Sequence, residues 1–320
     1  IFFFQNNISF FKYMIKSITQ DGHPINIPST FHRYKVLKSL GCGSTSSVYL
    51  VEDVNTHKLY AAKIISKIDA ENRNIVKSIQ NEVKILQKIK HPYIIKIEDF
   101  FEMKNEYEEE YYVMIMEYCE NGDLVSYITN KGFNTEADKK KIVKKFLEAI
   151  QYLHKKGISH GDIKSDNILL DHDFSPKLCD FGFAKMTKTA GDDGKNGTLY
   201  YAAPELFFEG KFDPLKADIY AIGITLYSMS ELEFPFDSDE QNSIIQQIVS
   251  GKLTIKSGID NQLRKLVEKC TCMNPKNRPT IEEIIQNDYF ACDSKNNNMC
   301  KTKIHSYKNI EAMNIQFFEI

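Results

Sequence analysis

The fold is decided by two short stretches, His160-Gly161-Asp162-Ile163-Lys164-Ser165-Asp166-Asn167 and, thirteen positions after Asn167, Asp180-Phe181-Gly182. Single Asp and Asn residues in loops most often form turns. Here the order and spacing of these residues would rarely arise by chance, so the interpretation as simple turn residues is set aside. The sequence on the two sides of these stretches also differs in type, which indicates two structural parts.

The part before the stretches is rich in β-structure. Short β-branched and aromatic runs at 34–40, 48–52 and 59–65 are separated by Gly, Ser, Asn and Thr, which predicts three antiparallel strands. Two further strands are expected at 94–101 and 111–116. Between the two groups, apolar residues recur at helical spacing and predict one amphipathic helix; they are Ile75, Ile79, Val83, Leu86 and Ile89.

The part after Gly122 is helical. Residues 136–156 carry an apolar face, and further helices are expected to begin near Ala217, Ser243, Asn261 and Thr280. The sequence therefore predicts an α+β, two-lobed fold, with a small antiparallel β-lobe that has one main helix and a larger, mostly helical lobe. We expect the lobes at 34–118 and 119–291, a partly disordered N-terminal extension at 1–33 and a C-terminal tail at 292–320.

Composition excludes several classes of protein. The 320 residues are 42% hydrophobic and 26% charged, with a net charge of −2, so no global field favours nucleic acid or a membrane surface. No apolar run reaches the roughly 20 residues that span a bilayer. Seven cysteines without a regular spacing favour a reducing compartment, so we expect a cytoplasmic protein, with a nuclear location left open.

The N-terminal segment is a poor signal peptide, because it lacks a basic start and a small-residue cleavage site. The chain begins with Ile1, and Met14 precedes an ordinary polar segment. We therefore expect residues 1–13 to be upstream translated sequence.

Two patterns in the first lobe are suited to holding phosphates. Gly41, Gly43 and Ser46 stand between two strands, where small residues let backbone N–H groups approach phosphate oxygens. An ordinary Gly-rich hairpin turn would have the same appearance. Lys63 lies in the third strand and Glu82, nineteen positions on, lies on the inner face of the helix; the alternative for this pair is a surface ion pair.

Together with 160–167 and 180–182, these patterns resemble the protein kinase family over about residues 34–290. The resemblance implies that Asp162 orients the substrate hydroxyl and accepts its proton, and that Lys164 neutralises the γ-phosphate of ATP. It implies Mg²⁺ held by Asn167 and Asp180, two oxygen ligands that suit a hard cation. It adds Lys63, Glu82 and Thr198 to the catalytic set.

The same resemblance implies the nucleotide and peptide contacts. Backbone groups of the hinge near Met116, Glu117 and Cys119 would bind the adenine edge, and Asp123 would reach the ribose. The platform for a peptide substrate would end at Gly197-Thr198 and Ala203-Pro204-Glu205, with Glu205 paired to Arg278. The remaining nucleotide contacts implied are Leu40, Gly41, Gly43, Ser46, Val48, Ala62 and Leu169.

The sequence departs from the family at Gly161, where an Arg usually pairs with a phosphate on the activation segment. The usual phosphosite position, four residues before Thr198, is Gly194, with Asp192 and Asp193 beside it. We predict that activity does not depend on phosphorylation there. Thr187 and Thr189 stay open as other sites.

The sequence thus predicts a monomeric serine/threonine protein kinase that uses ATP and Mg²⁺ on a protein substrate; Lys164 with Thr198 is typical of this class, and dual specificity stays open. One alternative is a pseudokinase or ATP-binding scaffold, against which stands the presence of Lys63, Glu82, Asp162, Asn167 and Asp180. Another is a small-molecule kinase, because His-Gly-Asp resembles the triplet of aminoglycoside and choline kinases. Lys164 and the peptide platform argue against it.

Overall fold

The computed structural model describes residues 27–42, 46–187 and 197–291 in full, and the backbone alone of Ser17–Ile18, Pro24–Ile25 and Gln316–Phe317. The chain divides into two compact units. The first comprises Ile1–Ile89 and Ile95–Tyr118, and the second Lys90–Ile94 and Cys119–Ile320. Residues 1–13 and 188–196, on which several predictions fall, lie outside the described residues.

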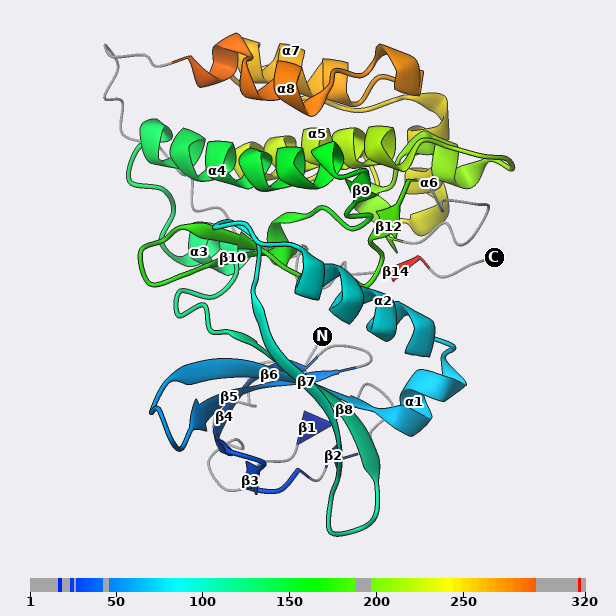
Figure 1. The fold of residues 1–320 in the computed structure, drawn as a ribbon. Helices are drawn as coiled ribbons and strands as arrows, with labels where there is room; N and C mark the ends of the chain where they lie inside the picture. Colours follow the sequence, from blue (N-terminus) through cyan, green and yellow to red (C-terminus); the bar gives the residue numbers. More distant parts are fainter. Residues whose placement is uncertain are drawn as a thin grey trace. The chain divides into compact units, whose positions relative to one another are not determined.

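The first unit is built on a six-stranded antiparallel sheet with the order β3-β4-β5-β6-β8-β7 (Figure 1). The predicted strands are confirmed, with one shift. β7 begins at Ile97, not at Ile94, because Ile94 belongs to the second unit and forms a bridge with Leu178 of that unit. The strands are β3 (Thr30–Phe31), β4 (Tyr34–Cys42), β5 (Ser47–Asp53), β6 (Leu59–Ser66), β7 (Ile97–Lys104) and β8 (Glu110–Glu117).

Two helices pack on this sheet, α1 (Lys67–Asn72) and α2 (Val76–Lys88). The predicted amphipathic helix is α2, and its buried face carries Ile79 and Val83 into a cluster with Met114 of β8. Glu82 is buried on the same helix. The apolar spacing that forms the helix therefore also directs one carboxylate inward, toward the sheet.

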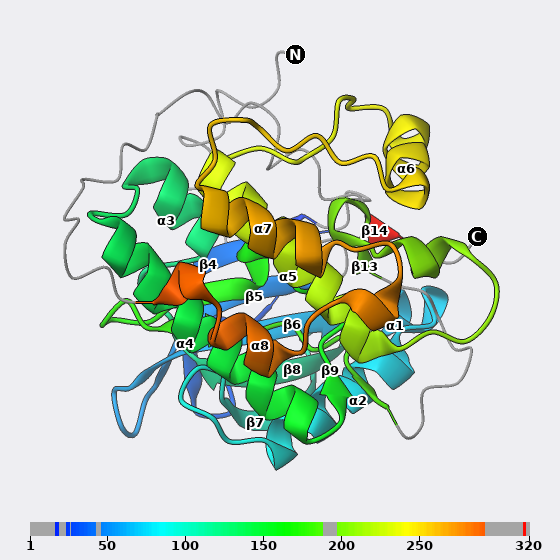
Figure 2. The same ribbon diagram turned by 90° about the horizontal axis from the view of Figure 1, so that it is seen from above.

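The second unit is mostly helical. Its central helix is α5, in which every residue from Asp218 to Met229 is buried, as expected of a helix that is apolar on all sides. Figure 2 shows α7 along α5 and α8 along α4, and these pairs are in contact. The helices are α3 (Leu124–Asn130), α4 (Glu136–Lys155), α5 (Pro214–Glu231), α6 (Gln241–Ser250), α7 (Asn261–Cys270) and α8 (Ile281–Ile285).

Caps explain where these helices begin. α7 starts at the predicted residue, and α8 starts after Thr280, whose side chain forms a capping box with Glu283. α5 starts three residues before the predicted Ala217, because Asp213 caps it and Pro214 occupies its first position.

Short strands and 3₁₀ turns connect the helices of the second unit. Antiparallel pairs join β9 to β12, β10 to β11 and β13 to β14. In the first unit, β1 pairs with β2. The bounds are β1 (Ser17–Ile18), β2 (Pro24–Ile25), β9 (Ile158–Ser159), β10 (Ile168–Leu170), β11 (Pro176–Leu178), β12 (Lys185–Met186), β13 (Gly197–Thr198) and β14 (Gln316–Phe317). The 3₁₀ turns are η2 (Ser165–Asn167), η3 (Leu199–Tyr201), η4 (Pro204–Phe207), η5 (Pro275–Asn277) and η6 (Asp288–Phe290).

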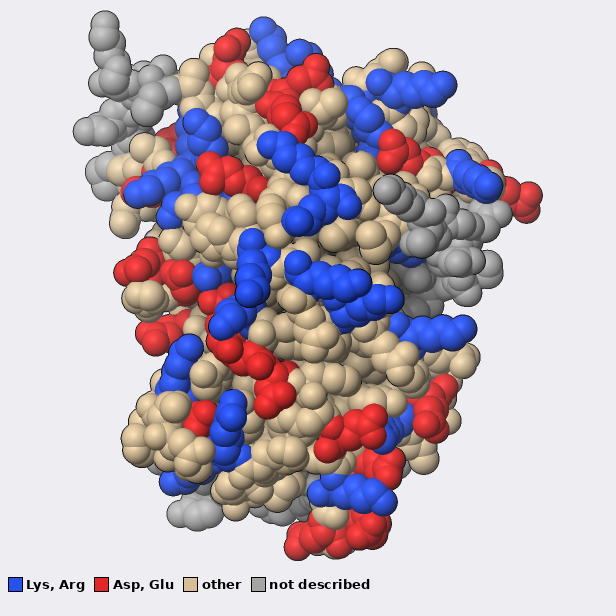
Figure 3. Space-filling view, viewed as in Figure 1, with Lys and Arg blue, Asp and Glu red and all other residues tan. Residues whose placement is uncertain are grey.

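The described surface mixes charges of both signs. On the face drawn in Figure 3, Lys and Arg side chains are interspersed with Asp and Glu. Across the ranges that the structure describes, no helix is both long enough and apolar enough to cross a membrane.

Candidate active site

Four of the predicted site residues meet in one buried network in the second unit. The loop between β9 and β10 carries Asp162, whose Oδ1 accepts a hydrogen bond from Thr198 Oγ1 at 2.8 Å. Its Oδ2 accepts one from Asn167 Nδ2 at 2.9 Å and lies 3.0 Å from Lys164 Nζ. Lys164 Nζ also donates to Thr198 Oγ1 at 2.7 Å. The carboxylate is thus held from three sides by side chains that come from two separate segments.

The Lys164 ammonium stays charged in this network. Burial acts to lower the pKa of Lys164, but the carboxylates of Asp162, Asp166 and Asp180 together outweigh it, and the pKa lies above its ordinary value. The lysine is therefore protonated at neutral pH. It can neutralise a further negative charge without losing its proton.

Asp218 of α5 holds the backbone of this loop. Its carboxylate accepts hydrogen bonds from the backbone N–H groups of His160 at 2.9 Å and Gly161 at 3.0 Å, and His154 Nε2 lies 2.9 Å from Oδ2. The sequence analysis did not assign Asp218 to the site. His154 was missed, although it stands in the last turn of α4, next to the buried Leu153.

The His160 ring links the two decisive stretches. Its Nε2 lies 3.0 Å from the carbonyl oxygen of Cys179, and its Nδ1 accepts from the Asp162 N–H at 3.3 Å, a pattern that requires the neutral ring protonated at Nε2. Phe181 packs edge-on against the same ring, with centroids 4.9 Å apart. The segment that contains Asp180 is therefore fixed to the loop that contains Asp162.

Asp180 has a left-handed backbone, with φ 60°, which is uncommon outside Gly and is tolerated best by Asp and Asn. Such conformations persist where the surrounding structure imposes them, and they concentrate at functional sites. Here Asp180 stands between Cys179, whose carbonyl oxygen contacts the His160 ring, and the fully buried Phe181.

The structure gives a physical reason for Gly161. Its φ is 80°, and a Cβ atom there would lie 2.6 Å from the backbone carbonyl oxygen of Phe183. Any side chain, including the Arg that the family usually has, would require Phe183 to move. The glycine also borders a cavity of about 50 Å³ that Phe183, Lys185, Gly197 and Phe212 help to line.

In the first unit, Lys63 of β6 and Glu82 of α2 form a bidentate contact, with Nζ 3.2 Å and 3.0 Å from the two carboxylate oxygens. Their side chains are 17% and 4% exposed, so the alternative of a surface ion pair is wrong. Val48 lies opposite Lys63 in the sheet register, and Ala62 is fully buried. The lysine is thus held in a fixed place beside small and branched apolar residues.

The other predicted nucleotide contacts are placed in several ways. Leu40 and Gly41 are exposed in β4, Ser46 is half-buried, and Gly43 lies outside the described residues. Met116 and Glu117 end β8, and Glu117 Oε1 accepts from the Lys96 N–H at 2.7 Å.

Two of the predicted contacts lie in the second unit and support its own structure. Cys119 is buried, and Asp123 caps α3, where its carboxylate accepts from the N–H and the hydroxyl of Ser126. Asp123 also forms an isolated bridge with Leu169. Its contact with ribose stays a prediction.

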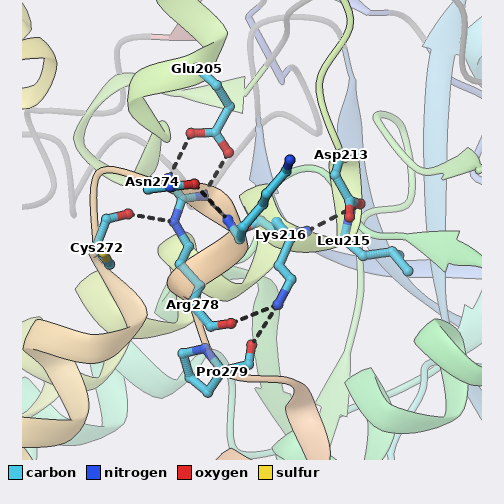
Figure 4. A network of polar contacts seen from close by, with 9 residues as sticks. Glu205, Asp213, Leu215, Lys216, Cys272, Asn274, Arg278 and Pro279 are labelled. Carbon is cyan, nitrogen blue, oxygen red and sulfur yellow. Dashed lines mark hydrogen bonds and ion pairs between the residues drawn. The ribbon is translucent and has the colours of Figure 1, made fainter.

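The pair of Glu205 and Arg278 is confirmed and is the centre of a polar network (Figure 4). The guanidinium contacts both carboxylate oxygens at 2.6 Å and 2.7 Å, and it also donates to the carbonyl oxygens of Cys272 and Lys216. Lys216 Nζ in turn donates to the carbonyl oxygen of Arg278 at 2.6 Å. This network fixes the end of the segment that follows Thr198 to α5 and η5.

Comparison with known proteins agrees with this geometry. The chain matches the family described as protein kinase domain over residues 34–290. It is 30% identical over 326 residues to the serine/threonine-protein kinase cds1 of Schizosaccharomyces pombe, covering 97% of this chain and 70% of that protein. It is 29% identical over 280 residues to CBL-interacting serine/threonine-protein kinase 14 of Arabidopsis thaliana, covering 84% and 62%. It is 31% identical over 257 residues to sperm motility kinase 2B of Mus musculus, covering 80% and 51%.

The chain belongs to the protein kinase family. The curated proteins that it matches include serine/threonine protein kinases. The chain spans between about half and 70% of the length of these three relatives.

Proposed function

We propose that this chain is catalytically active and transfers the γ-phosphate of ATP to a serine or threonine hydroxyl of a protein, with Asp162 as the residue that orients the hydroxyl. The observation that supports this most is the buried network of Asp162 with Lys164, Asn167 and Thr198. A chain that had become a scaffold would not need to retain this network.

The network leaves room for one substrate hydroxyl. A carboxylate offers about four acceptor positions, and three side-chain donors, Thr198, Asn167 and Lys164, occupy three of them on Asp162. The remaining position can accept the hydrogen bond of a serine or threonine hydroxyl. As that oxygen attacks phosphorus, Asp162 takes its proton, and Lys164 balances negative charge on the transferred group.

The donor set suits magnesium. Both amide hydrogens of Asn167 are directed to Asp162, to its carbonyl oxygen at 2.8 Å and its Oδ2 at 2.9 Å, which leaves the Asn167 amide oxygen as a metal ligand. Asp180 would supply the second oxygen. When bound, Mg²⁺ neutralises charge on the phosphates. In the described ranges no three His, Cys, Asp or Glu residues form a dedicated metal cage, which fits an ion that takes its other ligands from water and ATP.

In the first unit, Lys63 would hold the α- and β-phosphates of ATP. Glu82 pairs with the ammonium and limits the rotamers of the lysine, so less side-chain entropy is lost when the nucleotide binds. Val48 and Ala62, on β5 and β6, would contact the adenine ring.

Regulation without a phosphate near Gly194 is part of this proposal. The backbone gives a reason for glycine in place of Arg at position 161. Its positive φ and the nearby Phe183 carbonyl oxygen disfavour any side chain there. The same fact weakens the small-molecule kinase reading, since the glycine has a local structural cause. We further propose a monomer in the cytoplasm, with a nuclear location left open, and no nucleic-acid partner.

The proposal is tested by offering several acceptors to the full chain with Mg-ATP. Purified protein is assayed for ADP release and label transfer to a basic protein, to a tyrosine-containing polymer, and to choline and an aminoglycoside, with and without prior phosphatase treatment. We expect label on phosphoserine and phosphothreonine of the basic protein, before and after phosphatase. Label on the small molecules alone, or ATP binding with no transfer to any acceptor, would contradict the proposal.

A further inference from the structure

A second segment of this chain lies beside the residues that receive a substrate. The backbone of β14, Gln316–Phe317, pairs antiparallel with β13, Gly197–Thr198, in the register Gly197 to Phe317 and Thr198 to Gln316. Both strands belong to the second unit. The two segments are 118 positions apart in the sequence, by the difference between Gln316 and Thr198.

The strand that β14 joins is fixed to the loop of Asp162. Thr198 Oγ1 donates to Asp162 Oδ1 at 2.8 Å, and a Cβ atom on Gly197 would lie 3.2 Å from the Gly161 carbonyl oxygen. Paired antiparallel strands have Cα atoms about 4.5–5.5 Å apart. The backbone of Gln316 is therefore one strand spacing away from a residue that touches the catalytic carboxylate.

β13 has an edge that accepts an extended peptide. Within the part of the chain that the structure describes, β14 is its sheet partner, in a sheet of two strands. Unpaired backbone groups of such an edge bind extended chains by strand addition, with little demand on side chains. A protein substrate that approaches Asp162 in extended form would meet the same edge.

The sequence around β14 has no group that the kinase can phosphorylate. Residues 308–320 contain no Ser, Thr or Tyr. A segment bound beside Asp162 without an acceptor hydroxyl occupies the place of a substrate and is not turned over. It is also tethered to the enzyme, which gives it an effective concentration of about 1 mM.

We propose that the segment carrying Gln316–Phe317 adds to the edge of Gly197–Thr198 as an internal competitor of the protein substrate. The inference rests on the proposed function, because it needs β13 to be the place where a substrate lies. At about 1 mM effective concentration, a segment with an intrinsic Kd of about 0.1 mM is about 90% bound and raises the KM for the protein substrate roughly tenfold. The KM for ATP and kcat stay unchanged.

The first test removes the strand pairing with proline, which lacks the N–H that a sheet requires. The full chain with Gln316→Pro and Phe317→Pro is compared with a matched control that carries Asn297→Pro and Asn298→Pro. We expect the KM for a basic protein substrate to fall about tenfold in the first variant only. Equal KM values in the two variants and the unchanged chain would overturn the inference.

The second test needs no catalytic activity. A fluorescent peptide of residues 308–320 is titrated against the Gln316→Pro, Phe317→Pro variant and against the unchanged chain, and a peptide with the same two prolines serves as control. We expect the first peptide to bind the variant at least fivefold tighter than the unchanged chain, whose own segment competes, and the proline peptide to bind neither.

The two tests separate the inference from the function on which it rests. Selective peptide binding by a protein that phosphorylates nothing would retain the strand contact and contradict the proposed kinase activity. Full kinase activity without selective peptide binding would retain the proposed function and overturn the internal competitor.

Discussion

Replacing Glu205 by Gln should destabilise the second unit strongly. The Arg278 side chain is 0% exposed and that of Glu205 is 14% exposed, and two hydrogen bonds of 2.6 Å and 2.7 Å join them. Removing one partner of a buried ion pair costs about 3–5 kcal/mol, because the other charge stays buried without compensation. Arg278 would keep only neutral carbonyl partners, those of Cys272 and Lys216.

For a domain of this size, 1 kcal/mol shifts Tm by about 2–4 °C, so Glu205→Gln should lower Tm by roughly 6–12 °C at the lower end of that cost. The matched control is Glu233→Gln, because Glu233 pairs with Lys256 at 2.7 Å with side chains 44% and 48% exposed. Exposed pairs are worth about 0–1 kcal/mol. Thermal unfolding of both variants that gives equal small shifts would refute the argument from burial.

Three further predictions follow from the site and its surroundings. Thr198→Val removes a hydroxyl that is hydrogen-bonded to two charged groups, Asp162 and Lys164. Such hydrogen bonds are worth about 1.5–3 kcal/mol, so kcat should fall about 10- to 100-fold and recover in Thr198→Ser. A fully active Val variant would contradict this. Gly161→Ala should lower Tm and kcat together, since the left-handed backbone alone costs about 1–2 kcal/mol and the new Cβ meets the Phe183 carbonyl oxygen; an unchanged Tm would argue against it. Burial raises the pKa of Tyr227 from 10.0 to about 12, so its neutral form stabilises the native state fully below pH 10 and that contribution is lost as pH rises from about 10 to 12. Urea unfolding at pH 9 and 11 should show a smaller alkaline loss in Tyr227→Phe, and equal losses would count against the assignment.

Much of the fold was predictable because the signals are local. The strands of the first unit follow from β-branched runs, and α2 follows from an apolar spacing that also directs Glu82 inward. Two element ends were missed for different reasons. β7 begins late because Ile94 forms a bridge with Leu178, a tertiary contact. α5 begins early because Asp213 caps it and Pro214 occupies its first position, a local signal that the apolar spacing alone does not contain.

The site was predictable in its residue types and less so in its contacts. Motif spacing identified Asp162 and Thr198, but no local pattern indicates that their side chains are joined by a hydrogen bond. A side chain at position 161 is disfavoured by the carbonyl oxygen of Phe183, more than twenty positions away in the sequence. The pairing of β13 with β14 joins segments still farther apart. Such contacts depend on the whole chain path, which a sequence pattern does not contain.

The central claim is that Asp162 orients the substrate hydroxyl and accepts its proton. Its most direct test is the single-turnover rate of phosphoryl transfer by the full chain carrying Asp162→Asn, with Asp173→Asn, an exposed loop carboxylate, as the matched control. The Asn side chain keeps the shape of Asp and can still accept from Thr198, so the account predicts ATP binding close to that of the unchanged chain. Lys164 stays buried without its carboxylate partner, so Tm should fall by several degrees, and the rate is measured well below the lowered Tm. The account also predicts a rate reduced about 10²- to 10⁴-fold in Asp162→Asn and unchanged in Asp173→Asn. A transfer rate in Asp162→Asn equal to that of the control would contradict the account.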